Sequence, residues 1–124
     1  MTTDTVHVRL ESVLKRFGDV VAVSGVSLDI ARGSLTTVLG PSGCGKTTIL
    51  RLIAGFLEPD AGNILIDGAS QRGLPPYLRK TSTVFQEYAL FPHMSVLNNV
   101  AYGLRLRRLP RAAIAEKVRH TLSL

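Results

Sequence analysis

The chain has 124 residues, of which 45% are hydrophobic and 19% charged, and its formal net charge is +6 at pH 7. This length suits one domain and this composition suits a packed core, which excludes a disordered protein. Apolar runs such as residues 64–66 are far too short to span a bilayer. The single cysteine, Cys44, excludes an intrachain disulfide.

The first thirty residues predict β-strands. Residues 6–17 combine β-branched and apolar residues with partial alternation, and Gly18 and Asp19 then form a turn signal. Residues 20–23 and 26–30 predict further strand pieces. Residues 35–39 form a short apolar and β-branched run between glycines, which predicts a strand buried on both faces.

The pattern becomes helical after the glycine-rich stretch that follows. Within residues 46–56, apolar side chains share one helix face and Gly55 lies near the expected end: Ile49, Leu50, Ile53 and Ala54. Residues 63–67 then predict a short strand closed by Gly68. Residues 69–80, with Gly73 and two prolines, predict a surface connection, and residues 81–85 predict another strand.

Two helices are predicted at the end of the chain. Ser95 can cap a helix over residues 96–106, and Pro110 precedes a second helix over residues 111–122. The second helix carries apolar residues four apart: Ile114, Val118 and Leu122.

Residues 40–47 match the phosphate-binding pattern G-x-x-x-x-G-K-[ST]: Gly40, Pro41, Ser42, Gly43, Cys44, Gly45, Lys46 and Thr47. Glycines let successive backbone N–H groups point into one concavity, and the helix that follows directs its positive dipole end to the same place. Lys46 can reach the β- and γ-phosphates, and the Thr47 hydroxyl can bind Mg²⁺. The alternative is a glycine-rich turn that only joins a strand to a helix.

The sequence resembles the N-terminal part of an ABC transporter ATP-binding subunit. Three segments carry the resemblance. The first is the phosphate-binding pattern continued by Thr48 and by residues 49–55 (Ile-Leu-Arg-Leu-Ile-Ala-Gly), and the second is Asp60-Ala61-Gly62 with residues 64–68 (Ile-Leu-Ile-Asp-Gly). The third is residues 84–96 (Val-Phe-Gln-Glu-Tyr-Ala-Leu-Phe-Pro-His-Met-Ser-Val) with Asn98-Asn99-Val100. The resemblance implies an α/β fold of the P-loop NTPase class. That fold has a RecA-like core and an antiparallel β subdomain in about residues 1–94, followed by a truncated helical subdomain in about residues 95–124.

The same resemblance assigns roles to single residues. Gln86 corresponds to the glutamine that touches Mg²⁺ and the attacking water, so Gln86 and Lys46 are the expected catalytic residues. Gln86 and Thr47 are the expected Mg²⁺ ligands. Phe17 corresponds to the aromatic residue that stacks on adenine, where many relatives have tyrosine. A core position for Phe17 stays open.

Parts of the family pattern do not occur. The chain contains no Leu-Ser-Gly-Gly-Gln-like signature and no apolar strand ending in Asp-Glu, and His7, His93 and His120 do not match the switch histidine. Hydrolysis in the family needs two domains facing head to tail. We therefore expect this chain to be a fragment of a longer subunit, with weak nucleotide binding at most and no turnover.

The expected function is that of the energy-coupling ATPase of a bacterial importer, bound to the cytoplasmic face of the inner membrane. Its expected partners are a second ATPase subunit, the membrane permease and, indirectly, a substrate-binding protein. Residues 88–94 are unusually apolar for a loop, which predicts either a permease contact or a loop tucked into its own core. The spermidine/putrescine type is expected, with ferric iron, phosphonate and sugar importers as alternatives.

Two other classes of function remain as alternatives. A P-loop kinase or GTPase would share the loop but not the segment around Gln86. A nucleic-acid-binding module is suggested by the charge distribution, since residues 101–124 hold six Lys/Arg and one Glu. The arginines there alternate with leucines and lack an aromatic base-stacking platform, so a solvated helix end is the simpler interpretation and no nucleic acid is expected: Arg105, Arg107, Arg108 and Arg111.

Overall fold

The computed structural model describes residues 5–39, 45–85 and 87–124. The chain divides into two compact units, Met1–Thr83 and Val84–Leu124.

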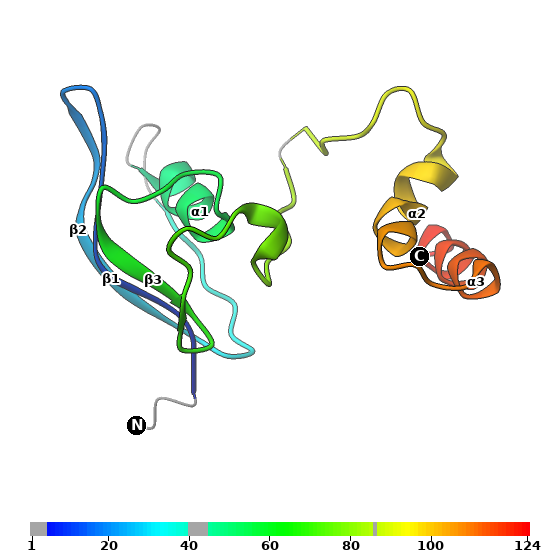
Figure 1. Ribbon diagram of the computed structural model, residues 1–124, viewed down its shortest axis with the longest axis horizontal. Helices are drawn as coiled ribbons and strands as arrows, with labels where there is room; N and C mark the ends of the chain where they lie inside the picture. Colours follow the sequence, from blue (N-terminus) through cyan, green and yellow to red (C-terminus); the bar gives the residue numbers. More distant parts are fainter. Residues whose placement is uncertain (1–4, 40–44, 86) are drawn as a thin grey trace. The chain divides into compact units, whose positions relative to one another are not determined.

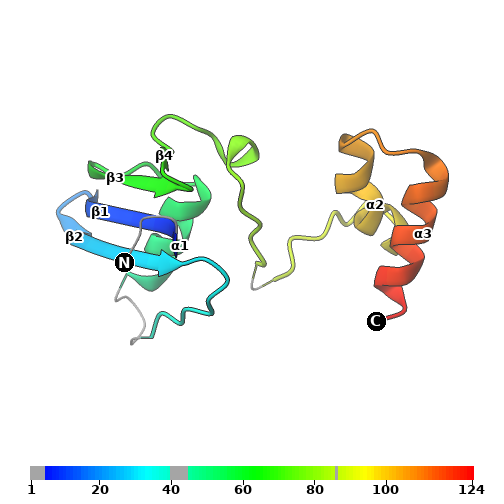
Figure 2. The same ribbon diagram turned by 90° about the horizontal axis from the view of Figure 1, so that it is seen from below.

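The first unit is built on an antiparallel sheet with the strand order β2-β1-β3-β4, of which Figure 1 labels β1 to β3 and Figure 2 all four strands. The strands are β1 (Val6–Phe17), β2 (Val20–Ala31), β3 (Ala61–Ile66) and β4 (Ala69–Ser70). Strands β1 and β2 form a hairpin around the predicted turn, and the two predicted pieces of β2 are one continuous strand. On its other edge β1 pairs with β3, from Val8 opposite Ile66 to Leu14 opposite Ala61.

Helix α1 (Lys46–Ala54) packs on this sheet (Figure 2). Leu52 is fully buried, with Ile49 and Ile53 beside it. Their sheet partners are the inward-facing residues of three strands: Val8, Leu10, Val13, Val23, Ile64 and Ile66. The helix ends at Gly55, whose left-handed backbone (φ 93°) lets its N–H return to the carbonyl of Arg51. The predicted helix is therefore confirmed, but its predicted apolar face is wrong for Leu50, which is 57% exposed. Leu52 is buried instead, because the face that meets the sheet runs through Ile49, Leu52 and Ile53.

Two predicted strands do not form. Residues 35–39 belong to none of the paired strands, and Leu35 and Leu39 are 95% and 85% exposed, so the expectation of a strand buried on both faces was wrong. Residues 81–85 likewise form no strand, and Val84 is almost fully exposed. A buried strand needs neighbouring strands on its edges, and within the described residues the only ladders join β1 with β2, β1 with β3, and β3 with β4.

The predicted surface connection over residues 69–80 is only partly at the surface. It contains the short strand β4 and a 3₁₀ helix, Pro76–Leu78. Gln71 and Arg79 within it are buried. The expectation was wrong for these two side chains because their hydrogen-bonding groups meet backbone carbonyls inside the unit.

The second unit contains the two predicted helices, α2 (Val96–Leu106) and α3 (Arg111–Leu122). They pack side by side, with Ala101 and Val118 buried. Ser95 caps α2 as predicted, because its hydroxyl accepts a hydrogen bond from the N–H of Asn98 (3.1 Å). None of the helices formed by the described residues has the length and apolar character that crossing a membrane requires.

Candidate nucleotide-binding site

Gly45 and the start of helix α1 form the part of the phosphate-binding pattern that the structure describes. Lys46, Thr47 and Thr48 form its first turn, with Thr47 exposed. The helix has no side-chain cap and no acidic residue in its first turn, so its N-terminal N–H groups and dipole favour an anion. Gly40, Pro41, Ser42, Gly43, Cys44 and the predicted catalytic residue Gln86 lie outside the described residues.

Gly45 joins this helix start to the sheet. Its backbone has φ 91°, and a Cβ built on it would lie 2.4 Å from the carbonyl oxygen of Ala22. Only glycine permits both the left-handed conformation and this contact. Ala22 lies in β2 between Val21 and Val23, which pair with Arg16 and Lys15 of β1. The end of the phosphate-binding pattern therefore rests on the hairpin that carries Phe17.

Phe17 is the last residue of β1 and is 46% exposed. Its ring is therefore not part of the core, and the alternative of a core position does not hold. The ammonium group of Lys15 lies 5.5 Å from the ring centroid, a cation–π distance. The structure thus places a solvent-accessible aromatic ring on the same hairpin as the Gly45 contact.

The arrangement fits a nucleoside triphosphate and Mg²⁺. A cationic side chain, an exposed hydroxyl and an uncapped helix start suit phosphate oxygens and a hard cation, and the exposed ring of Phe17 suits a base. Among residues 5–39, 45–85 and 87–124, no three His, Cys, Asp or Glu side chains gather to hold a metal ion. The Thr47 hydroxyl and the phosphate oxygens of a bound nucleotide are hard oxygen ligands that suit Mg²⁺, and the other predicted ligand, Gln86, lies outside the described residues.

Within the part of the chain that the structure describes, the groups with shifted pKa values belong to ion pairs of the sheet. Arg9 donates two hydrogen bonds to Asp29 (2.8 and 3.1 Å), which lowers the pKa of Asp29 and raises that of Arg9. Hydrogen bonds from His7 and Arg32 lower the pKa of Asp67. These pairs lie toward the start of β1, away from Phe17, and stabilise the sheet.

Arg79 is a residue that sequence reasoning missed. Its side chain is 1% exposed, yet its guanidinium donates to five acceptors: the carbonyl oxygens of Leu52, Ile53, Gln71 and Leu74, and the carboxylate of Glu58. Two of these carbonyls, those of Leu52 and Ile53, lie in the last turn of helix α1. Arg79 therefore ties the far end of α1 to the segment that leads, seven residues on, to Gln86. No signal in the sequence pointed to Arg79, because a single arginine belongs to no motif and most of its partners are backbone carbonyls, which every residue has.

In the second unit, residues 88–94 form an exposed loop, which we call the aromatic loop. Tyr88 is 76% exposed and Leu90 is also largely exposed, so the alternative of a loop tucked into its own core does not hold for these residues. Phe91 packs on Tyr102 of α2, with ring centroids 4.8 Å apart. Asn99 of α2 accepts a hydrogen bond from the Phe91 N–H and donates to the carbonyls of Phe91, Met94 and Ser95.

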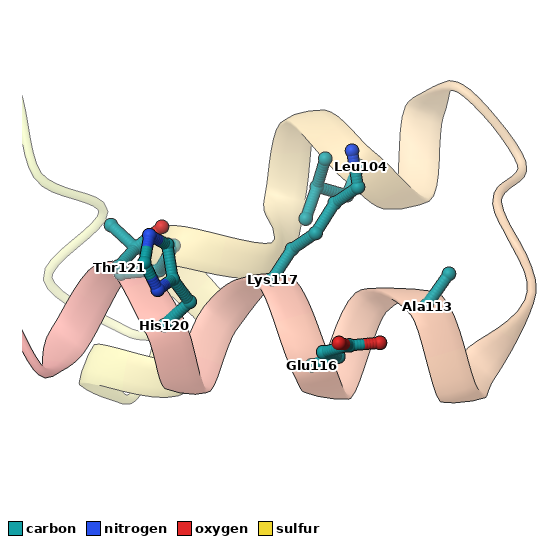
Figure 3. Close-up of a pocket in the computed structure, with 7 residues that line it drawn as sticks. Leu104, Ala113, Glu116, Lys117, His120 and Thr121 are labelled. Carbon is teal, nitrogen blue, oxygen red and sulfur yellow. The ribbon is translucent and has the colours of Figure 1, made fainter.

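A groove of about 660 Å³ lies between α2 and α3 (Figure 3). It contains none of the predicted site residues. Its wall combines apolar side chains of both helices with the polar residues of α3: Val100, Leu104, Ala113, Glu116, Lys117, His120 and Thr121. His120 is exposed there, consistent with an ordinary surface histidine.

The antiparallel sheet, the helix packed on it and the glycine-rich sequence before that helix fit a nucleotide-binding domain of the P-loop class. A family model described as "ABC transporter" matches residues 23–124, and the chain belongs to that family. The resemblance inferred from the sequence and the predicted fold class are both confirmed.

Curated relatives narrow the comparison. The chain is 57% identical over 113 residues to the "Spermidine/putrescine import ATP-binding protein PotA" of Rubrobacter xylanophilus, covering 91% of this chain and 30% of that protein. It is 52% identical over 118 residues to the protein of the same name from Lawsonia intracellularis, covering 95% of this chain and 32% of that protein. The chain thus spans about a third of the length of these relatives.

Solved structures support the same fold. An ADP- and phosphate-bound dimer of the ATP-binding cassette MJ0796, described as a post-hydrolysis state, matches with a TM-score of 0.82 at 27% identity, covering 94% of this chain and 56% of that one. The cbiO1 protein of Clostridium perfringens, described as part of the cbiONQ transporter complex, matches with a TM-score of 0.77 at 29% identity. The match covers 96% of this chain and 50% of that one.

Proposed function

We propose that this chain is the nucleotide-binding part of the energy-coupling ATPase of a bacterial spermidine/putrescine importer. The observation that carries the proposal is its identity of 50–57% to several import ATP-binding proteins of that name, across more than nine-tenths of its length. These relatives favour polyamines over the ferric iron, phosphonate and sugar alternatives. The family match and the predicted segment around Gln86 favour a transporter over an unrelated P-loop kinase or GTPase.

The proposed roles of the residues follow from their chemistry. Residues 40–48 would hold the phosphates through backbone N–H groups, and Lys46 would neutralise the β- and γ-phosphate charge. Thr47 and Gln86 would bind Mg²⁺, and Gln86 would orient the attacking water. Phe17 would stack on the adenine. When bound, MgATP supplies the phosphoryl group whose hydrolysis drives transport.

We place the complete protein at the cytoplasmic face of the inner membrane, as a dimer bound to permease subunits. The exposed aromatic loop, with Tyr88 and Leu90, offers an apolar surface suited to a permease helix. The match to a dimeric cassette and to a component of a transporter complex supports both associations. A substrate-binding protein would act through the permease.

Nucleotide binding by this chain is tested by measuring the Kd for MgATP by equilibrium dialysis, with Lys46→Ala as the comparison. We expect weak, Lys46-dependent binding. The signature motif and the Asp-Glu strand end do not occur in the sequence, so we expect no ATP turnover. Lys46-dependent hydrolysis by the 124-residue chain would contradict this expectation, and Lys46-independent binding would contradict the proposed site.

The cargo is tested in the source organism by interrupting the gene that encodes this chain and measuring uptake of labelled spermidine, putrescine, ferric iron, phosphonate and sugars. The proposal expects a selective loss of polyamine uptake. A loss confined to one of the other cargoes would assign the importer to that cargo instead.

A further inference from the structure

The turn between α1 and β3 makes three contacts with the end of β1, all from one residue. The Asp60 N–H donates to the carbonyl of Leu14 (2.8 Å). Its carboxylate accepts a hydrogen bond from the backbone N–H of Arg16 (2.7 Å) and lies 3.7 Å from the ammonium group of Lys15. Asp60 therefore contacts each of the three residues that precede Phe17.

These contacts lie where the sheet stops supporting β1. Pairing between β1 and β3 ends at Leu14 opposite Ala61, and the pairing with β2 is irregular between Lys15 and Arg16. The end of β1 is thus held by β2 on one edge only. An N–H without a ladder partner needs another acceptor, and the Asp60 carboxylate supplies it for Arg16.

Lys15 extends the same arrangement to the ring. Its side chain is only 16% exposed, and its ammonium group lies both near the Asp60 carboxylate and over the ring of Phe17. Asp60 is therefore linked to Phe17 in two ways, through the backbone of Arg16 and through the ammonium group of Lys15.

We infer that Asp60 is a positioning residue for the adenine-binding ring of Phe17. This inference rests on the proposed function, in which Phe17 stacks on the base. Asp60 holds the end of β1 and the ring in one orientation before the nucleotide arrives, which reduces the ordering cost of stacking. Gly45 contacts β2 at the Ala22 carbonyl, whereas the three Asp60 contacts described above are all with β1. Loss of Asp60 then weakens binding of the base and leaves binding of the phosphates intact.

The test compares ATP with inorganic tripolyphosphate, which lacks the base, both with Mg²⁺. Asp60→Ala removes the carboxylate from Arg16 and Lys15. Asp60→Asn keeps an oxygen acceptor for Arg16 and removes the ion pair. Asp19→Asn removes a negative charge from the turn of the same hairpin and serves as the matched control.

Because base–aromatic stacking changes affinity by about fivefold or more, we expect Asp60→Ala to weaken ATP binding by about that factor. Asp60→Asn weakens it less, and Asp19→Asn leaves it unchanged. Tripolyphosphate affinity is the same in all four proteins. In a Phe17→Ala background, Asp60→Ala has no further effect on ATP affinity, because the two residues act together.

Equal losses for ATP and tripolyphosphate would overturn the inference by showing a general structural role for Asp60. An unchanged ATP affinity in Asp60→Ala would overturn it as well. A parent chain that binds tripolyphosphate as tightly as ATP would refute stacking by Phe17 and the inference with it. A parent chain that binds neither probe would instead overturn the proposed function.

Discussion

Arg79 shows how one side chain can organise the interior of the first unit. A guanidinium presents five N–H donors in a fixed plane, and here they meet four carbonyls and one carboxylate. Gly55 makes this possible, because a Cβ at that position would lie 2.6 Å from the Arg79 Nε atom. Burying this charge costs desolvation, which the hydrogen bonds to all five acceptors offset, and removing the guanidinium leaves those acceptors without their donors.

Replacing Arg79 is expected to destabilise the chain strongly. Arg79→Met leaves buried carbonyls without donors and should lower the free energy of unfolding by about 3 kcal/mol or more. Arg79→Lys keeps the charge but loses the planar arrangement of guanidinium donors, so its free energy of unfolding should lie between those of the parent and Arg79→Met. Urea unfolding monitored by circular dichroism measures both. An Arg79→Lys variant as stable as the parent would show that the fork geometry is unimportant.

Gly45→Ala is expected to affect both folding and ligand binding. The new Cβ meets the carbonyl oxygen of Ala22 at 2.4 Å, and the φ of 91° is strained for alanine. We expect a loss of stability of about 1 kcal/mol or more and loss of MgATP binding. Gly68→Ala is the matched control, since Gly68 also has positive φ but nothing lies within 4 Å of its Cβ position. Equal effects of the two substitutions would show that the Ala22 contact is not the cause.

Among the secondary-structure elements, α2 carries its own start signal and also shapes the loop before it. Ser95 accepts the hydrogen bond of the Asn98 N–H. One turn further along, the Asn99 side chain makes four hydrogen bonds that fix the aromatic loop against the helix. The orientation of the exposed loop is therefore set by the helix that follows it.

Ser95→Ala should destabilise α2 by about 1 kcal/mol through loss of its N-cap. Amide hydrogen exchange localises the effect, with faster exchange expected in the first turn of α2 and in the aromatic loop. Ser123→Ala, at the C-terminal end of α3 in the same unit, is the control. The Ser123 hydroxyl donates to the carbonyl of His120 and caps no helix start, so exchange in α2 should stay unchanged. Unchanged exchange in Ser95→Ala would contradict the role of the cap.

At the scale of the whole molecule, charge is arranged to join separate strands. Asp67 follows β3 and pairs with His7 of β1 and with Arg32 beyond β2. Asp29 of β2 pairs with Arg9 of β1. Both carboxylates have lowered pKa values because their partners hydrogen-bond to the charged form.

Stability should therefore fall at acid pH. A carboxylate with a lowered folded-state pKa contributes fully above its unfolded value of about 3.9, and this contribution is lost as the pH falls through the folded-state value. We expect Asp67→Asn and Asp29→Asn to be less stable than the parent at pH 7 and to decline less steeply below about pH 4. Thermal unfolding between pH 7 and pH 2 measures this. Parallel stability curves for the parent and the variants would contradict the expected difference in pH dependence. The pairs are exposed, so their contribution to stability is modest and decreases as the salt concentration rises.

The sequence by itself determined the elements whose signals are local. The β1–β2 hairpin, α1 with Gly55 at its end, and α2 and α3 with their flanking Ser95 and Pro110 follow from periodicity, turns and caps. The phosphate-binding pattern is also local, because its residues are consecutive in the chain. The family could be recognised from the sequence for the same reason.

Only the tertiary structure decided the features that depend on distant partners. Residues 35–39 have a strand-like sequence, but a strand forms only when another strand pairs with it, and none of the described strands does. Arg79 is buried because carbonyls from two separate segments converge on it. Asp60 reaches Arg16 across 44 positions of the chain. Local sequence specifies conformation, whereas burial and partners at long range are set only once the chain has packed.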